Sequence, residues 1–90
     1  MIPNNAKIHK KEKIPWRIIE NEVIIVDIER EDVLQLNEVG QQIWCLIDGT
    51  RSLTGITKEI TDIYDADEKV AEKDVAEFIK RLSEKGLIYY

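Results

Sequence analysis

The residues that could carry out chemistry are few and lie far apart in this sequence. His9 is the only histidine and Cys45 the only cysteine. A nucleophile needs a base beside it, and a structural zinc site takes about four ligands of this kind. We therefore interpret His9 as a surface residue and Cys45 as a partly exposed bystander. The sequence predicts no catalytic residue, no metal site and no cofactor.

Carboxylates are numerous but dispersed. The 18 Asp and Glu residues fall mostly on turns and on positions expected to be solvated. General acid–base catalysis requires two such groups that converge in a pocket, and no spacing points to such a pair. The glycines form no phosphate-binding loop. They stand at positions 40, 49, 55 and 86.

Length and composition favour one small folded domain. Ninety residues suit a single domain, and a hydrophobic content of 43% is too high for a disordered chain. No apolar run is long enough to span a membrane, and the N-terminus has no signal-peptide pattern, so the cytoplasm is the expected compartment. The net charge of −5 argues against nucleic acid, which is bound mainly through Lys and Arg.

Basic residues crowd the start of the chain, at Lys7, Lys10, Lys11 and Lys13. We expect residues 1–13 to be a flexible or irregular N-terminal arm, and residues 14–90 to form the folded domain. A solvated tail is the simpler interpretation of the arm. An electrostatic contact with an acidic partner is the alternative.

Three β-prone runs follow the arm. Residues 16–19 and 23–26 flank a turn and resemble a hairpin, and residues 33–36 give a third strand. The run at 23–26 is apolar on both faces. The arm or Trp16 could cover its outer face, or that face could contact a partner or a second copy of the chain.

The pattern then becomes helical. Asn37, Ser52 and Asp67 are candidate N-caps for three helices. The first helix has its apolar stripe at Val39, Ile43, Leu46 and Ile47, with Trp44 on the flank, and Gly49 suits a left-handed conformation after it. The second has Leu53, Ile56, Ile60, Ile63 and Tyr64, and the third has Ala71, Val75, Phe78, Ile79 and Leu82.

This order predicts an α+β fold that is winged-helix-like, with a three-stranded antiparallel sheet followed by three helices. Residues 87–90 could add a short terminal strand. A winged-helix DNA-binding domain is a distant alternative. Its third helix would carry a basic face, whereas the third helix here interleaves acids and bases. A purely structural subunit, or a fragment of a larger enzyme, is a further alternative.

Several ordered motifs resemble the PqqD family over residues 16–88. They are Leu36-Asn37-Glu38, Ile43-Trp44, Leu46-Ile47-Asp48-Gly49, Arg51-Ser52-Leu53, Tyr64-Asp65, Asp74-Val75, Phe78-Ile79, Leu82 and Gly86-Leu87-Ile88. The resemblance implies a recognition element for ribosomally made, post-translationally modified peptides. Such an element binds the leader of a precursor peptide and presents the precursor to a modifying enzyme or a leader protease.

The resemblance also implies a site, in which the leader adds as a strand beside the third strand and lies against the third helix. By position, the peptide-binding residues are Asp32, Val33, Leu34, Gln35, Leu36, Val75, Phe78, Ile79 and Leu82. Phe78 lies at the margin of its apolar stripe and could line a pocket. For Val75, Ile79 and Leu82, packing in the core is the favoured interpretation.

Two pathways fit this resemblance. One is the stand-alone leader-binding protein of lasso-peptide assembly, which we favour, and the other is the partner of a radical-SAM enzyme, as in pyrroloquinoline quinone synthesis. The expected partners are a leader peptide and one such enzyme, without nucleic acid or membrane. A homodimer is an open alternative.

Overall fold

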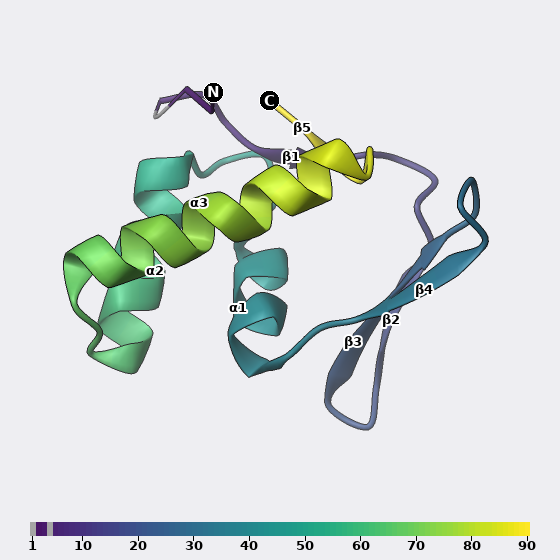
Figure 1. Cartoon of the computed structure of the whole chain (residues 1–90), viewed down its shortest axis with the longest axis horizontal. Helices are drawn as coiled ribbons and strands as arrows, with labels where there is room; N and C mark the ends of the chain where they lie inside the picture. The colour runs from purple at the N-terminus through teal and green to yellow at the C-terminus, as the bar shows by residue number, and fades with distance from the viewer. Residues whose placement is uncertain (1, 4) are drawn as a thin grey trace.

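A computed structural model describes residues 2–3 and 5–90, so positions 1 and 4 of the predicted arm lie outside the described residues. The predicted α+β fold, with three antiparallel strands followed by three helices, is confirmed (Figure 1). The short terminal strand predicted within residues 87–90 is present, and a second short strand, which was not predicted, lies near the N-terminus. The elements are β1 (His9–Lys10), β2 (Trp16–Ile19), β3 (Glu22–Asp27), β4 (Asp32–Gln35), α1 (Glu38–Leu46), α2 (Leu53–Tyr64), α3 (Glu68–Glu84) and β5 (Ile88–Tyr89).

The main sheet has β3 at its centre, between β2 and β4, and all its pairs are antiparallel. Glu20 and Asn21 form the β2–β3 turn with φ angles of 51° and 67°, the left-handed geometry that matches strand twist in a two-residue hairpin turn. Ile25 pairs with Trp16 on one side and Leu34 on the other, so these three side chains share the inner face of the sheet.

The outer face of the sheet keeps apolar side chains. Along β3, Val23, Ile25 and Asp27 are buried, whereas Ile24 and Val26 alternate toward the outside. Trp16 shares the inner face with Ile25, so it does not cover the outer face.

The three predicted N-caps are confirmed. Asn37 Oδ1 accepts from the Gly40 N–H at 2.8 Å, and Ser52 Oγ accepts from the Gly55 N–H at 3.2 Å. Asp67 Oδ1 accepts from the N–H groups of the next helix, α3. Each cap supplies a partner for a main-chain donor that the first turn of a helix leaves unpaired.

The core lies between the inner face of the sheet and the three helices. Trp44, predicted on the flank of the apolar stripe of α1, has a fully buried side chain. α1 packs against β3 as well as α2. The side chains of α1 that are buried therefore extend beyond its predicted apolar stripe. The indole of Trp44 meets Trp16 edge-on at 5.8 Å between ring centroids. Val39, expected in the same stripe, is instead exposed in the first turn.

Part of the predicted N-terminal arm is bonded to the domain. We call residues 7–11 the N-terminal strap. β1 pairs with β5, the Ile8 N–H donates to the Arg51 carbonyl, and the Gly49 N–H donates to the Ile8 carbonyl. Ile8 is completely buried. The domain boundary predicted at residue 13 remains a prediction, but the strap belongs to the packed structure.

The ammonium group of Lys10, in the strap, lies over two indole rings of the same domain. Its Nζ lies 4.7 Å from the centroid of the Trp16 ring and 4.9 Å from that of Trp44, distances at which an ammonium is attracted to an indole face. Burial lowers the pKa of Lys10, and the charges of Cys45 and Asp48 oppose that shift. Over the described part of the chain, no helix is both long and apolar enough to cross a membrane.

Replacing Gly49 by alanine is expected to lower the free energy of unfolding. Gly49 has φ +84°, and an added Cβ would lie 2.8 Å from His9 Nδ1. The left-handed conformation alone costs a non-glycine residue about 1–2 kcal/mol. Urea unfolding measures the loss. Gly55→Ala is the matched control, because Gly55 is helical with open contacts, and it should raise stability by about 0.5–1 kcal/mol.

Candidate functional site

The outer edge of β4 is open. The Leu36 N–H donates to the Val23 carbonyl at 3.3 Å, so Leu36 and, two residues before it, Leu34 direct their main-chain groups toward β3. Antiparallel pairing alternates from residue to residue, which directs the N–H and C=O groups of Val33 and Gln35 away from the sheet. Within residues 2–3 and 5–90, no strand pairs with this edge.

Two hydrogen bonds made by side chains of β4 lie at or beside this edge. Asp32 Oδ1 accepts from the Val33 N–H at 2.8 Å, so one outward donor already has an acceptor in its own strand. The Gln35 side chain donates to the Glu22 carboxylate across the outer face of the sheet. The Gln35 main-chain N–H is therefore the central open donor of the β4 edge, and an incoming strand must compete with Asp32 at Val33.

A pocket of about 280 Å³ lies directly beyond the C-terminal end of β4. We call it the Phe78 pocket. The first half of α1 and the middle of α3 form it, and it begins at Asn37, two residues after β4 ends. Its lining residues are Asn37, Val39, Gly40, Ile43, Asp74, Glu77, Phe78 and Arg81.

The Phe78 pocket has an apolar floor and a charged rim. A Cβ on Gly40 would lie 3.2 Å from Phe78 Cε1, so the glycine allows the ring to lie close to α1. Phe78 is half-buried, as expected for a residue at the margin of a stripe. Asp74, Glu77 and Arg81 are exposed around it. Such a pocket suits an apolar side chain of a ligand that also carries polar or charged groups.

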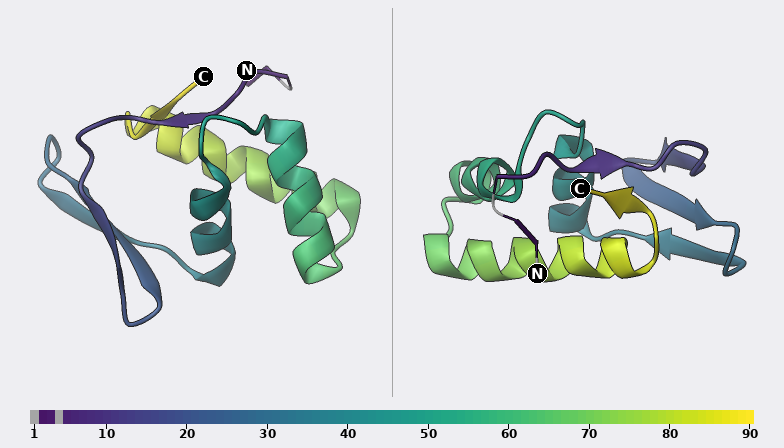
Figure 2. Two further views of the ribbon diagram at one scale, coloured as in Figure 1. Left: turned by 180° about the vertical axis from the view of Figure 1, so that it is seen from behind. Right: turned by 90° about the horizontal axis from the view of Figure 1, so that it is seen from above.

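The β4 edge and α3 lie on the same side of the molecule. In Figure 1, β4 lies in front of β3, and the right view of Figure 2 shows that β4 is the strand of the main sheet on the side of α3. A chain paired with β4 would therefore run between the sheet and α3 and would reach the Phe78 pocket. Strand pairing and a side-chain pocket are the two parts that recognition by strand addition uses.

The predicted site residues fall into two groups. Asp32, Val33 and Gln35 are exposed along the edge, whereas Leu34 and Leu36 are half-buried on the core side. Of the four predicted α3 residues, Phe78 alone lines the pocket. Val75, Ile79 and Leu82 are at most 2% exposed and pack in the core, which agrees with the favoured interpretation of these three.

The rim of the pocket was missed by reading the sequence. Asp74, Glu77 and Arg81 are spaced at i, i+3 and i+7 around Phe78, which places them on one face of α3. That spacing was a signal for a charged border around a half-buried aromatic ring. Val39 and Gly40 were missed because they come from a different helix.

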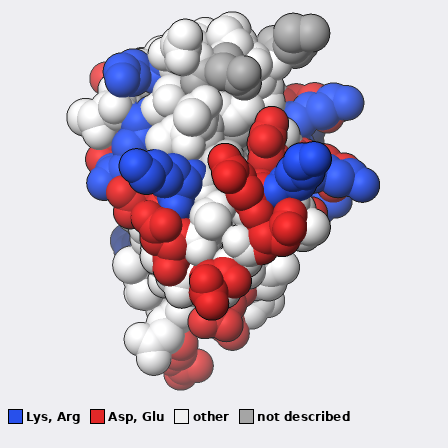
Figure 3. Space-filling model, turned by 90° about the vertical axis from the view of Figure 1, so that its left-hand side faces the viewer, with Lys and Arg blue, Asp and Glu red and all other residues white. Residues whose placement is uncertain are grey.

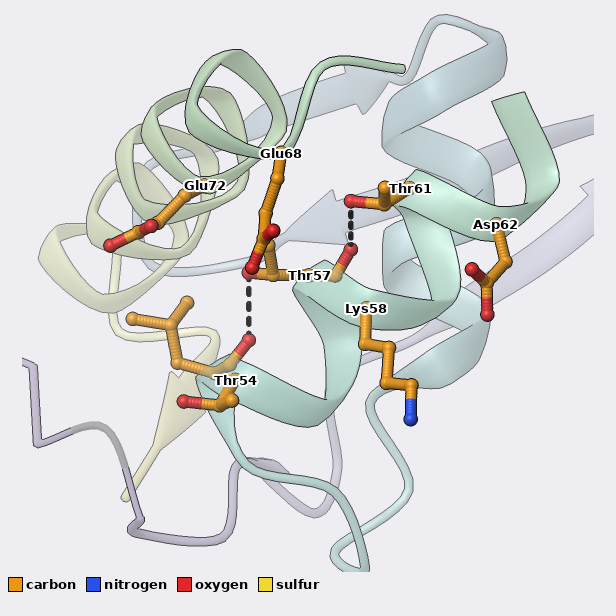
Figure 4. A pocket seen from close by; sticks show the side chains of 8 residues that line it. Thr54, Thr57, Lys58, Thr61, Asp62, Glu68 and Glu72 are labelled. Carbon is orange, nitrogen blue, oxygen red and sulfur yellow. Dashed lines mark hydrogen bonds between the residues drawn. The ribbon is translucent and has the colours of Figure 1, made fainter. Parts of the chain in front are cut away.

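A larger pocket, of about 400 Å³, lies elsewhere, between α2 and α3 (Figure 4). Thr57 Oγ1 donates to the Leu53 carbonyl at 2.8 Å and Thr61 Oγ1 to the Thr57 carbonyl at 2.9 Å, so both hydroxyls bond their own helix. The face viewed in Figure 3 carries acidic side chains in its middle and lower part, with basic side chains on either side of them. This pocket lacks the open main-chain edge that the β4 site offers.

No cluster of three or more His, Cys, Asp or Glu side chains that could hold a metal ion is found among the described residues. Cys45 is a free, exposed thiol, as predicted. His9 is half-buried and stacks on Tyr89 at 4.9 Å between ring centroids, so it serves the β1–β5 pairing instead of lying free on the surface.

These features define a class of protein: a small α+β domain whose sheet has its β4 edge open beside a long helix that lines a pocket. Within that class, the chain belongs to the PqqD family. The family model described as coenzyme PQQ synthesis protein D (PqqD) matches residues 22–88. The "PqqA binding protein" of Xanthomonas oryzae pv. oryzae (strain PXO99A) is 38% identical over 58 residues. That alignment covers 64% of this chain and 63% of the relative, slightly under two thirds of its length.

Solved structures share the fold. "TbiB1 in Complex with the TbiA(beta) Leader Peptide" has a TM-score of 0.80 at 24% identity, covering 91% of this chain and 98% of that one. "Lasso peptide synthetase B1 complexed with the leader peptide" has 0.81 at 20% identity, covering 94% and 100%. The PqqD truncation of Methylobacterium extorquens PqqCD, described as a stand-alone recognition element, has 0.79 at 18% identity, covering 100% and 96%.

Proposed function

We propose that this chain is a non-catalytic adaptor that binds the leader of a ribosomally synthesised precursor peptide and delivers it to a modifying enzyme or a leader protease. The leader adds as a strand along the β4 edge, beside Val33 and Gln35, and places an apolar side chain in the Phe78 pocket. Asp32, Leu34 and Leu36 shape the edge, while Val75, Ile79 and Leu82 support Phe78 from the core.

The open β4 edge is the observation that carries this proposal. An exposed strand with unpaired N–H and C=O groups accepts a foreign extended chain, and proteins otherwise tend to protect such edges. Membership of the PqqD family supports it, as do the printed names of the relatives, one of which binds PqqA and two of which are complexed with leader peptides.

Within this function we favour the lasso-peptide type. Two of the structurally similar proteins carry leader peptides, and one of those is named lasso peptide synthetase B1. The alternative is a PqqD-like partner of a radical-SAM enzyme, which the identity with the PqqA binding protein supports. The lasso type predicts tighter binding of a lasso-peptide leader, whereas the radical-SAM type predicts tighter binding of the PqqA peptide.

An NMR titration tests the proposal. The ¹⁵N-labelled protein is titrated with the TbiA(beta) leader and, separately, with the PqqA peptide of Xanthomonas oryzae. The amides of Val33 and Gln35 and those around Phe78 should shift with at least one of them, and tighter binding of the first would favour the lasso type. No shift with either peptide, or shifts confined to the α2–α3 pocket, would reject the proposed site.

Replacing Phe78 by alanine should weaken binding of the peptide that shifts these amides by about tenfold, because the pocket loses the ring that forms its floor. Isothermal titration calorimetry gives the affinity. Ile60→Val is the control, since Ile60 is buried in α2, does not line the pocket, and its loss of one methyl costs about 0.5–1.5 kcal/mol of stability. Equal affinity losses in both variants would show that Phe78 acts through stability alone.

A further inference from the structure

Arg30, in the turn between β3 and β4, contacts two distant parts of the chain. Its Nη1 lies 3.2 Å from Asp27 Oδ2, and its main-chain N–H donates to Asp27 Oδ1 at 3.3 Å. The same guanidinium reaches the end of α3. Nη1 donates to the Lys85 carbonyl at 2.6 Å, and Nη2 donates to the Glu84 carbonyl at 3.2 Å.

Both contacts satisfy groups that need a partner. The side chain of Asp27 is only 5% exposed, so its carboxylate depends on the charge that Arg30 brings. The carbonyls of Glu84 and Lys85 are at the C-terminal end of α3, where main-chain acceptors lack helical partners and the helix dipole favours a cation. The planar fork of arginine suits two acceptors at once. One side chain thus connects the buried inner face of the sheet to the end of the helix.

The position of this connection matters because the rest of the sheet is attached elsewhere. The main contact between the sheet and the helices is that of β3 with α1. At the C-terminal end of β4, Gly40 and Phe78 bring α1 and α3 together. At its N-terminal end, the turn that carries Arg30 reaches α3 through the guanidinium. Figure 1 shows this turn and the C-terminal end of α3 on the same side of the molecule.

We infer that Arg30 is a positioning residue that fixes the spacing between the β4 edge and α3, and thereby the width of the space that a bound peptide must fill. Its effect on peptide affinity rests on the proposed function, whereas its effect on the spacing does not. Without the guanidinium, the β3–β4 hairpin can move relative to α3, and a peptide that contacts both must restrict that motion on binding.

Pulsed electron–electron double resonance measures the spacing directly. Nitroxide labels are attached at Val33→Cys in β4 and Lys80→Cys in α3, both exposed positions, in a Cys45→Ser background. Arg30→Gln should broaden the distance distribution or shift it, and Arg30→Lys should restore it in part, because lysine can reach one carbonyl but lacks the fork. An unchanged distribution in Arg30→Gln would overturn the inference.

The chain offers a matched control in Arg51→Gln. Arg51 forms the same i, i+3 pair with Asp48, at 2.5 Å, in the loop between α1 and α2. This variant should leave the distance distribution unchanged. An equal broadening in both variants would show a general loss of order and would overturn the role assigned to Arg30.

Peptide affinity is the second measurement, made on unlabelled variants with the TbiA(beta) leader and the PqqA peptide. Arg30→Gln should weaken binding by about tenfold, Arg30→Lys by less, and Arg51→Gln not at all. Unchanged affinity in Arg30→Gln, with a wild type that binds, would overturn the link to binding. If the wild type binds neither peptide, the proposed function fails, and the distance distributions still decide whether Arg30 sets the spacing.

Discussion

Replacing Gln35 by proline is expected to abolish binding of the leader peptide while the domain remains folded. The main-chain N–H of Gln35 points away from the sheet, so proline removes no bond within the sheet itself. It removes the central open donor of the β4 edge and places a ring in the path of the incoming strand. We expect an affinity loss of at least about tenfold, measured by calorimetry with the peptide that binds the wild type.

Two further variants test whether the effect of Gln35→Pro comes from the main-chain N–H at the β4 edge. Ile18→Pro makes the same change in β2 on the opposite edge of the sheet, at a side chain that is 61% exposed, and should leave peptide binding intact. Gln35→Ala removes the side-chain bond to Glu22 but keeps the main-chain N–H, so it should also bind. Full affinity in a folded Gln35→Pro variant would show that the peptide docks elsewhere.

Replacing Ile8 by alanine is expected to be the most destabilising change in the N-terminal strap. Ile8 is completely buried and joins the core cluster, although it precedes the first strand of the main sheet. Truncating such a side chain costs about 2–5 kcal/mol, a large part of the roughly 5–15 kcal/mol that holds a domain folded. Urea unfolding monitored by tryptophan fluorescence should show the loss.

Ile28→Ala is the control for this prediction, because Ile28 is 64% exposed and its loss should change stability by about 0.5 kcal/mol or less. If Ile8→Ala unfolded at the same urea concentration as the wild type, the strap would contribute nothing to stability. Residues 1–13 would then behave as the irregular arm that the sequence predicts.

Much of the fold could be predicted because its signals are local. Asn37, Ser52 and Asp67 each mark a helix start by a bond to a main-chain N–H within three residues. The strap could not be predicted in this way. β1 has only two residues and pairs with the opposite end of the chain, at Tyr89 and Ile88, so no periodic pattern reports it. The burial of Trp44 likewise depends on the sheet packing against a second side of α1.

The candidate site, like the fold, could be predicted from the sequence only in part. A resemblance in sequence pointed to the β4 segment and to α3, and both border the open edge and the pocket. Which side chains reach the pocket depends on the approach of α1 to α3, set by Gly40 beneath the Phe78 ring. The contact of Arg30 with the carbonyls of Glu84 and Lys85 spans more than fifty positions of sequence, and no local rule predicts it.

The pairing of β1 with β5 has a mechanical consequence. His9 lies opposite Tyr89, so the first and last strands meet at their outer ends. Force applied to the two ends of the chain would therefore separate these strands from that end, breaking their hydrogen bonds one after another instead of all at once. Two residue pairs, the Ile8 side chain and the main-chain bonds of Ile8 to Arg51 and Gly49 would then yield before the load reached α3. An unfolding motor that grips either end would therefore dismantle this domain from the strap inward.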